Sequence, residues 1–239
     1  MSGPKKKQHY IPRMYLENFL TPNKKFCVYD IQNKKVLLNQ STAQFAHRRY
    51  YYDIDPETIK KLLRESLPTD IDESNYDHLI DEQYIENMLS RLEGDAKAVI
   101  DGLNNGSVAL SDYGVQSKLI IFFHALSQRN PKRRSIAEHI NKITRDHIIR
   151  SYKLDESNDH LKFYSEEAAK IDQLRSLVSI TDVLRLSEII ETNYNWFIGC
   201  VHSKYKLVIS DNPLEMLTSG LNDICIPLSH DKAIILRVK

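Results

Sequence analysis

Four polar residues stand where a side chain could take part in chemistry, each carried by an otherwise apolar stretch. His9 precedes a short predicted helix, Glu93 lies in an amphipathic segment, Arg129 ends the apolar run LIIFFHALSQRNP, and Asp211 follows an apolar strand. Imidazole, carboxylate and guanidinium groups in one cleft are suited to proton transfer and to stabilising negative charge. The sequence therefore predicts a His/Glu/Arg/Asp site, provided that the fold brings these segments together.

Arg129 is the residue on which this prediction depends most. At helical spacing Phe122 and Leu126 lie on one apolar stripe, and Arg129 continues the stripe one turn later. A guanidinium directed into a core needs a carboxylate or an anionic ligand, because an unpaired buried charge is very costly. Glu86 and Glu93 share one side of their helix and are expected to reach it. A pair that only joins two helices and a pair in which Arg129 clamps an anion both remain open.

His9 and Asp211 each have two interpretations. The pKa of an unperturbed imidazole lies near physiological pH, so His9 could transfer protons or bind a phosphate, or it could only anchor the N-terminal helix. Asp211 in the sequence Ser-Asp-Asn-Pro could be a base or a metal ligand, or it could only shape a turn. In the site, Glu93 and Asp211 would either orient the other groups or hold a divalent metal.

Basic residues beside tyrosines and beside Arg129 could bind phosphate directly. These candidate ligand-binding residues are Arg13, His47, Arg48, Arg49, Lys132 and Arg133. The segment HRRYYY (47–52) combines charges for phosphate with rings for stacking on bases, whereas its alternative interpretation is an edge strand with solvated arginines. The sequence contains no P-loop, GxGxxG, HExxH or EF-hand pattern, which disfavours nucleotide kinases, dinucleotide enzymes and zincins.

The net charge of +1 conceals a strong asymmetry along the chain. Asp53–Asp101 holds 14 acidic against 5 basic residues, and Val115–Lys153 holds 9 basic against 2 acidic residues. The two segments could attract each other on folding, or the basic one could bind phosphate. The small net charge of the whole chain disfavours a protein that binds polyanions over its entire surface.

Cysteine usage and hydropathy indicate the cellular setting. The three cysteines Cys27, Cys200 and Cys225 are widely spaced in apolar contexts, so we expect buried free thiols in a reducing compartment. No pair of cysteine or histidine residues has the sequence spacing that is typical of zinc ligands. The sequence has neither a signal peptide nor a run of the roughly 18–20 apolar residues that a membrane span requires. We therefore expect a cytoplasmic protein with no membrane among its partners.

Periodicity predicts helices in the middle of the chain and strands at both ends. The expected helices cover a short stretch after Pro12 and residues 59–67, 78–103, 111–129, 131–152 and 165–192, the last with a break at 179–182. The expected strands are 25–30, 34–38, 195–201, 206–210, 223–228 and 233–238. Residues 69–77 should form a loop, and residues 154–160 should be polar and mobile. The predicted fold is a single α+β domain over 1–239, in which the helical middle (about 57–192) packs on an antiparallel sheet built from the N-terminal (about 25–55) and C-terminal (about 195–238) strands.

Several segments together resemble a known family. They are QHYIPRMYLENFL (Gln8–Leu20), ENMLSRLEGDAKAVI with Glu86 and Glu93, QRNP with Arg129, VISDNP (Val208–Pro213) and IPLS (Ile226–Ser229). In this order they are similar to the proteins catalogued as domain of unknown function 4238. The resemblance spans nearly the whole chain and implies a bacterial or phage-related protein without an assigned activity. Members of that family usually continue beyond the IPLS strand with a further helix, whereas this chain stops at Lys239.

These features lead to a functional hypothesis and one alternative. We expect a protein that acts on nucleic acid or another phosphate-bearing ligand, with phosphodiester hydrolysis by a nuclease as the candidate reaction. In that mechanism Arg129 stabilises phosphoryl charge and His9 transfers protons. The alternative is a non-enzymatic binding or sensor module, in which His9, Glu93, Arg129 and Asp211 form a polar network that fixes the fold.

Overall fold

The structure is a computed structural model that describes residues 5–66, 80–213 and 223–239. Its helices are α1 (Arg13–Leu16), α2 (Pro56–Ser66), α3 (Tyr84–Asn105), α4 (Tyr113–Gln128), α5 (Pro131–Tyr152), α6 (Glu166–Val178) and α7 (Ile180–Asn193). Short 3-10 segments cover Glu17–Phe19, Thr42–Gln44 and Asp159–Tyr164. Its strands are β1 (Lys7–His9), β2 (Phe26–Asp30), β3 (Lys35–Gln40), β4 (His47–Arg49), β5 (Tyr194–Cys200), β6 (Ile224–Pro227) and β7 (Lys232–Val238).

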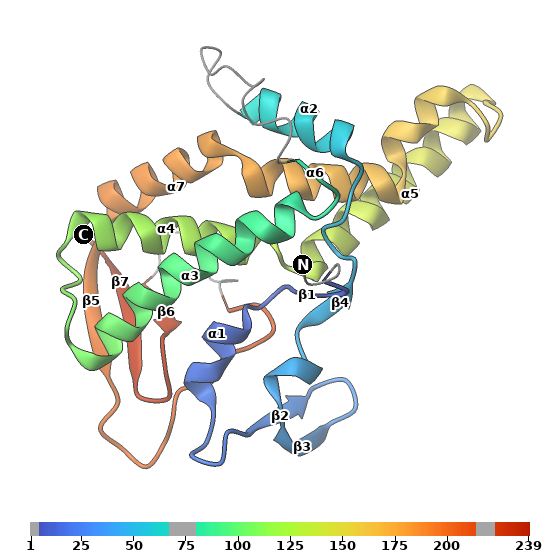
Figure 1. Ribbon diagram of the computed structural model, residues 1–239. Helices are drawn as coiled ribbons and strands as arrows, with labels where there is room; N and C mark the ends of the chain where they lie inside the picture. Colours follow the sequence, from blue (N-terminus) through green and yellow to red (C-terminus); the bar gives the residue numbers. More distant parts are fainter. Residues whose placement is uncertain (1–4, 67–79, 214–222) are drawn as a thin grey trace.

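Helices α3 and α4 run through the centre of the molecule (Figure 1). One end of α4 lies over the C-terminal sheet, α6 and α7 lie above α4 in the view, and α5 projects from the body at the upper right. The N-terminal helix α1 and the β2–β3 hairpin lie below α3. Central helices combined with antiparallel strands from both chain ends confirm the predicted α+β class.

Short-range signals set the ends of the central helices. The Asp112 carboxylate accepts from Gly114 N at 2.7 Å and caps α4. Helix α3 ends at Gly106, whose φ of +78° lies in the left-handed region that glycine adopts without steric cost. Pro131 starts α5 as a separate helix, with the Asn130 side chain accepting from Lys132 N at 2.8 Å. Arg129 is therefore held between two helices.

The strands pair only with neighbours from their own end of the chain. β1 pairs with β4, β2 with β3, and β7 lies between β5 and β6, all antiparallel. The N-terminal and C-terminal strands thus form separate sheets rather than one shared sheet. Residues 206–210 were expected to be a strand, and this prediction is wrong: both edges of β7 are already taken, so the segment pairs with no strand of the described chain, although Ile209 still packs on the core.

Other predicted boundaries can be compared with the described residues. The break near Ser179 is confirmed, since the Ser179 hydroxyl accepts from Asp182 N at 3.1 Å and starts α7. The predicted loop 69–77 lies outside the described residues. The predicted helix start at about His78 is wrong, because residues 80–83 are not helical and α3 begins at Tyr84. The segment 154–160, expected to be polar and mobile, enters a 3-10 helix at Asp159, where the Asn158 side chain caps the helix by accepting from His160 N at 3.1 Å.

The cysteine prediction is half right. Cys27, Cys200 and Cys225 are free thiols, but all three are exposed rather than buried. The reason is the two-residue period of a strand: Cys225 alternates with the buried Ile224 and Ile226 and therefore faces outward. None of the described helices combines the length and the apolar character needed to cross a bilayer.

Two clusters of buried side chains make up the core. The larger one packs α1, the second half of α3 and α4 against the C-terminal sheet, with Phe123 stacked on Trp196 at 6.4 Å between ring centroids. The smaller one packs 51–54, α2 and α6 against the first half of α3. His124 is buried, and its Nε2 hydrogen-bonds Ser176 O at 2.8 Å, so it joins α4 to α6 as a satisfied core histidine.

Candidate functional site

Arg129 and Glu93 form an ion pair between the two central helices. The Arg129 Nη1 donates to Glu93 Oε1 at 2.8 Å, and the Arg129 side chain is only 1% exposed. Its Nε and Nη2 atoms are buried and have no hydrogen-bond partner among the described residues. The expected contact between these two residues is present, and the guanidinium is almost completely enclosed.

Glu86 extends this polar cluster along α3. It lies two helical turns before Glu93, and its Oε1 atom is 3.7 Å from Lys5 Nζ. Burial raises the pKa of Glu86 to about 7, with the charge of Lys5 opposing the rise and the charge of Glu93 adding to it. Glu86 is therefore partly protonated near neutral pH.

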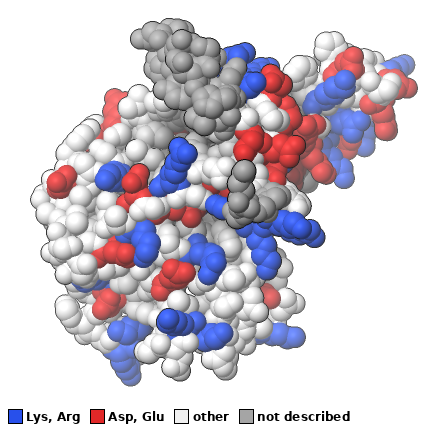
Figure 2. Space-filling model, viewed as in Figure 1, with Lys and Arg blue, Asp and Glu red and all other residues white. Residues whose placement is uncertain are grey.

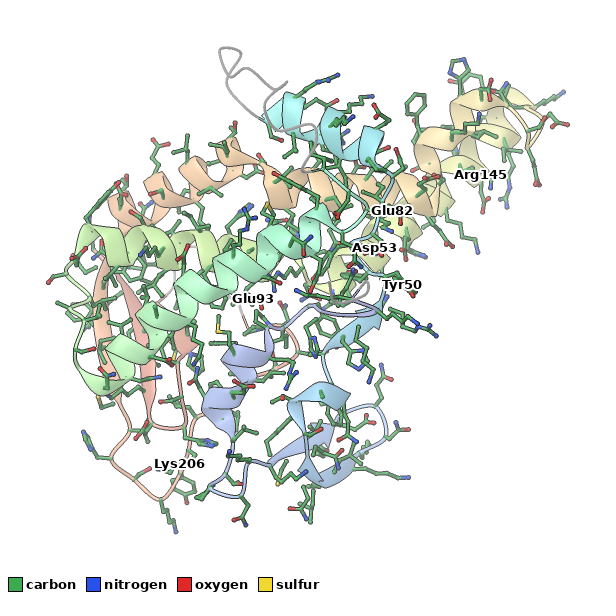
Figure 3. The ribbon with its side chains drawn as sticks, in the orientation of Figure 1. Tyr50, Asp53, Glu82, Glu93, Arg145 and Lys206 are labelled. Carbon is green, nitrogen blue, oxygen red and sulfur yellow. The ribbon has the colours of Figure 1, made fainter. Side chains whose placement is uncertain are left out.

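Tyr52 and Gln8 connect the cluster to β1. The buried Tyr52 hydroxyl donates to His9 O at 3.1 Å, and Arg129 is close enough to oppose the rise that burial causes in the Tyr52 pKa. Gln8, also fully buried, accepts from Tyr52 N at 2.6 Å and donates to the Asp53 carboxylate. In Figure 3 Asp53 lies near the N-terminal end of α3, and Glu93 lies farther along the same helix. The strand that carries His9 is thus fixed to the core by side-chain hydrogen bonds.

The His9 ring lies in a different environment from the ion pair. His9 is opposite His47 in the β1–β4 register, and their rings meet edge to face at 5.3 Å between centroids. Burial, together with the charges of His47 and Arg13, lowers the pKa of His9 to about 4. Its Nε2 atom is buried without a partner among the described residues. His9 is therefore neutral at pH 7, and it makes no hydrogen bond or ion pair with Glu93, Arg129 or Asp211 within the described chain.

Asp211 lines a groove on the other side of β1. The groove has a volume of about 500 Å³ and is lined by Tyr10, Arg48, Asn130, Pro131, Lys132, Ser135, Ile136, His139 and Asp211. Its walls come from the end of β1, from β4, from the first two turns of α5 and from the segment after β5. Burial raises the pKa of the Tyr10 phenol, and the charge of Asp211 raises it further, so these two side chains are neighbours.

A buried cation lies beside this groove on α5. The Arg134 guanidinium stacks on the Tyr51 ring at 3.8 Å, and its Nε donates to Gln173 Oε1 at 2.6 Å. Its Nη2 donates to Tyr51 O at 3.0 Å, and no carboxylate forms an ion pair with it in the described part of the chain. Neutral groups therefore satisfy the guanidinium, and its positive charge is left to act on the surroundings of the α5 N-terminus.

The predicted residues are distributed over three environments. Glu93 and Arg129 are together in the core, His9 and His47 are together in the β1–β4 sheet, and Asp211 shares the groove with Arg48 and Lys132. The other predicted ligand-binding residues, Arg13, Arg49 and Arg133, do not line the groove. No three His, Cys, Asp or Glu side chains of the described residues lie close enough together to hold a metal ion.

Sequence reasoning missed four polar members of the groove, Tyr10, Asn130, Ser135 and His139. Ser135 and His139 follow Lys132 at intervals of three and four residues, so helical periodicity from the predicted start at Pro131 places all three on one face of α5. That signal was available in the sequence. Tyr10 carried no comparable signal, because its position beside Asp211 depends on segments 200 residues apart.

Comparison with curated proteins and with solved structures finds no significant match. A family model, by contrast, matches residues 7–238, which is nearly the whole length of the chain. The match includes β1, both central helices, the groove and the C-terminal sheet. This protein therefore belongs to the family described as protein of unknown function (DUF4238).

Proposed function

We propose that the protein binds a phosphate-bearing ligand, with nucleic acid as the preferred class, in the groove between β4 and the start of α5. The observation that carries this proposal is the grouping of Arg48 and Lys132, from distant segments, with the N-terminal end of a 22-residue helix. Both side-chain cations and the positive end of the helix dipole favour negative ligands. The positive charge of Arg134 beside the groove acts in the same direction.

The remaining groove residues favour a phosphate attached to a sugar. The Asp211 carboxylate can accept a hydrogen bond from a ligand hydroxyl, but it repels a bare anion. The Tyr10 and Ser135 hydroxyl groups can donate to phosphate oxygens. A nucleotide or a nucleic-acid strand offers phosphate oxygens for the cations and a hydroxyl or an amino group for the carboxylate.

In this proposal Glu93 and Arg129 support the site rather than touch the ligand. With 1% of its side chain exposed, Arg129 cannot reach a bound phosphate without a rearrangement of the core. This burial favours the interpretation in which the Glu93–Arg129 pair only joins two helices. Phosphodiester hydrolysis stays a second proposal, and the presence of Asp211 and His139 in the same groove favours these two, rather than His9, as its acid–base pair.

We also propose that the protein works in the cytoplasm. All three cysteines of the described chain are free although they are exposed, and a reducing compartment keeps exposed thiols in this state.

The binding test uses fluorescently labelled single-stranded RNA, single-stranded DNA and duplex DNA, titrated by fluorescence anisotropy at several salt concentrations. Arg48→Ala and Lys132→Ala should each weaken binding and reduce the slope of log K against log salt by about 0.7 for a single strand or about 0.9 for a duplex. Competition with inorganic phosphate and with ATP separates a phosphate-only site from a strand-binding site. Incubation of the same strands, followed by gel electrophoresis, reports hydrolysis.

The matched control is Lys118→Ala, which removes an exposed lysine from α4, away from the groove. It should leave both affinity and slope unchanged. Binding of no strand, nucleotide or phosphate, or equal losses in the control and in the groove variants, would contradict the proposal.

A further inference from the structure

The β2–β3 hairpin exposes an apolar face. Strand alternation and the pairing of Tyr29 with Val36 bring four large side chains to this face: Tyr29, Ile31, Val36 and Leu38. All four are more than half exposed, and Ile31 at the tip reaches 75%. On the opposite face Phe26 packs against Phe45, so the exposed face is turned away from the body. The hairpin thus projects apolar groups that nothing in the described chain covers.

A second segment with the same character lies at this end of the molecule. The irregular stretch 201–210 exposes Tyr205 and Val208, at 72% and 81%. Leu207 N donates to His230 O at 2.8 Å, and His230 Nε2 is 3.3 Å from Leu20 O, just before the chain enters β2. Figures 1 and 3 show this stretch, marked by Lys206, and the hairpin along the lower end of the view.

Lysines outnumber acidic residues in both apolar segments. Residues 21–45 contain Lys24, Lys25, Lys34 and Lys35 against the single acid Asp30, and residues 201–210 contain Lys204 and Lys206 without an acid. The Asp30 carboxylate is held inside the turn by Asn33 N and Nδ2 at 3.0 and 2.8 Å. None of the six lysines forms an ion pair within the described residues, and Figure 2 shows basic side chains along this lower end.

We propose that this end, which we call the lysine-rim face (residues 24–38 and 204–208), docks on an anionic lipid surface. Exposed aliphatic groups and tyrosines suit the boundary between headgroups and acyl chains, and lysines around them attract anionic headgroups. The proposal concerns adsorption at headgroup level, whereas the expectation of no membrane partner was based on spanning segments.

Two features favour lipid over other occupants. A second copy of the chain would bring two clusters of lysines together, and like charges disfavour that contact. The apolar groups stand on two separate protruding segments, whereas a protein partner would need a matching hollow for each of them. A fluid lipid surface can take up both segments without preformed hollows.

The test is co-sedimentation of the whole protein with vesicles of phosphatidylcholine alone and of phosphatidylcholine mixed with phosphatidylserine. The protein should bind the mixed vesicles only, and less at high salt. Ile31→Ser with Leu38→Ser should abolish sedimentation. Lys34→Ala with Lys35→Ala should weaken partitioning about fivefold for each lysine, the equivalent of about 1 kcal/mol per charge.

Matched controls remove similar groups elsewhere. Ile143→Ser removes an exposed isoleucine of α5, and Lys118→Ala removes an exposed lysine of α4. Both should sediment like the parent protein, and circular dichroism should show that all variants are folded. No binding to the mixed vesicles, or equal losses in the controls, would overturn the proposal. The proposal would also be overturned if analytical ultracentrifugation detected a dimer and the double change Ile31→Ser, Leu38→Ser dissociated that dimer.

Discussion

The ion pair between Glu93 and Arg129 joins an enclosed cation to a carboxylate that water still reaches. The Arg129 side chain is 1% exposed, whereas the Glu93 side chain is 26% exposed. Removing Arg129 would leave a carboxylate that can hydrate, but removing Glu93 would leave a buried charge without its partner. The two halves of the pair are therefore unequal in their effect on stability.

This inequality gives the first prediction. Glu93→Ala should lower the free energy of unfolding by about 3–5 kcal/mol, because it leaves the buried guanidinium uncompensated. Arg129→Met, which replaces the charge with an apolar group of similar length, should cost clearly less. Urea denaturation followed by circular dichroism measures both changes. A larger loss for Arg129→Met than for Glu93→Ala would contradict the assignment of the pair to the scaffold.

The second prediction concerns the raised pKa of Glu86. Its pKa is 4.5 in an unperturbed side chain and about 7 in the fold, so the native state binds more protons than the unfolded state between these values. The contribution of Glu86 to stability should therefore decrease as pH rises from about 4.5 to about 7. Glu86→Gln should remove this decrease, which urea denaturation across that pH range measures. An unchanged pH profile in Glu86→Gln would refute the assignment.

The third prediction concerns the lowered pKa of His9, which has the opposite sign. The unfolded chain binds the extra proton between the folded value of about 4 and the unperturbed 6.5, so stability should rise with pH over this range. His9→Asn should reduce this rise and leave the part that the lowered pKa of the buried His124 contributes, together with the decrease that Glu86 causes. The double variant His9→Asn, Glu86→Gln should have a flatter profile than either single variant. The same profile in His9→Asn as in the parent protein would show that burial does not shift this imidazole.

The fourth prediction separates binding from hydrolysis in the groove. Asp211→Asn removes a negative charge from beside Arg48 and Lys132, so affinity for single-stranded RNA should rise several-fold at low salt. If the groove also cleaves the strand through Asp211, the same variant should bind more tightly while its cleavage rate falls. Weaker binding by Asp211→Asn, measured by anisotropy, would contradict a phosphate beside this carboxylate.

Much of the fold could be predicted from local patterns. Apolar periodicity placed the ends of α4 and α5 and the C-terminal end of α3 close to where they are observed, whereas α3 begins later than expected. The position of Arg129 on an apolar stripe also predicted its contact with a carboxylate, because burial leaves a guanidinium few other options. These inferences depend on residues close together in the sequence or on one strong physical constraint.

The features that could not be predicted from the sequence depend on contacts between segments that lie far apart in the chain. Nothing in the sequence indicated how strands far apart in the chain would pair, so the separate sheets and the irregular 206–210 segment were not foreseen. The groove combines Tyr10, Arg48, Lys132 and Asp211, which come from four distant segments. The lowered pKa of His9 arises from its burial opposite His47, which is also a consequence of tertiary structure.

The pairing of β1 with β4 has a consequence for how this family can vary. Lys7 is opposite Arg49, so the chain between them adds α1 to the core, forms the hairpin and returns to nearly the same point. Within this segment the β2–β3 hairpin forms its own sheet and pairs with no other strand of the described chain. Relatives can therefore gain or lose residues in its turn while keeping the register of every other sheet, and differences in length among them should concentrate there.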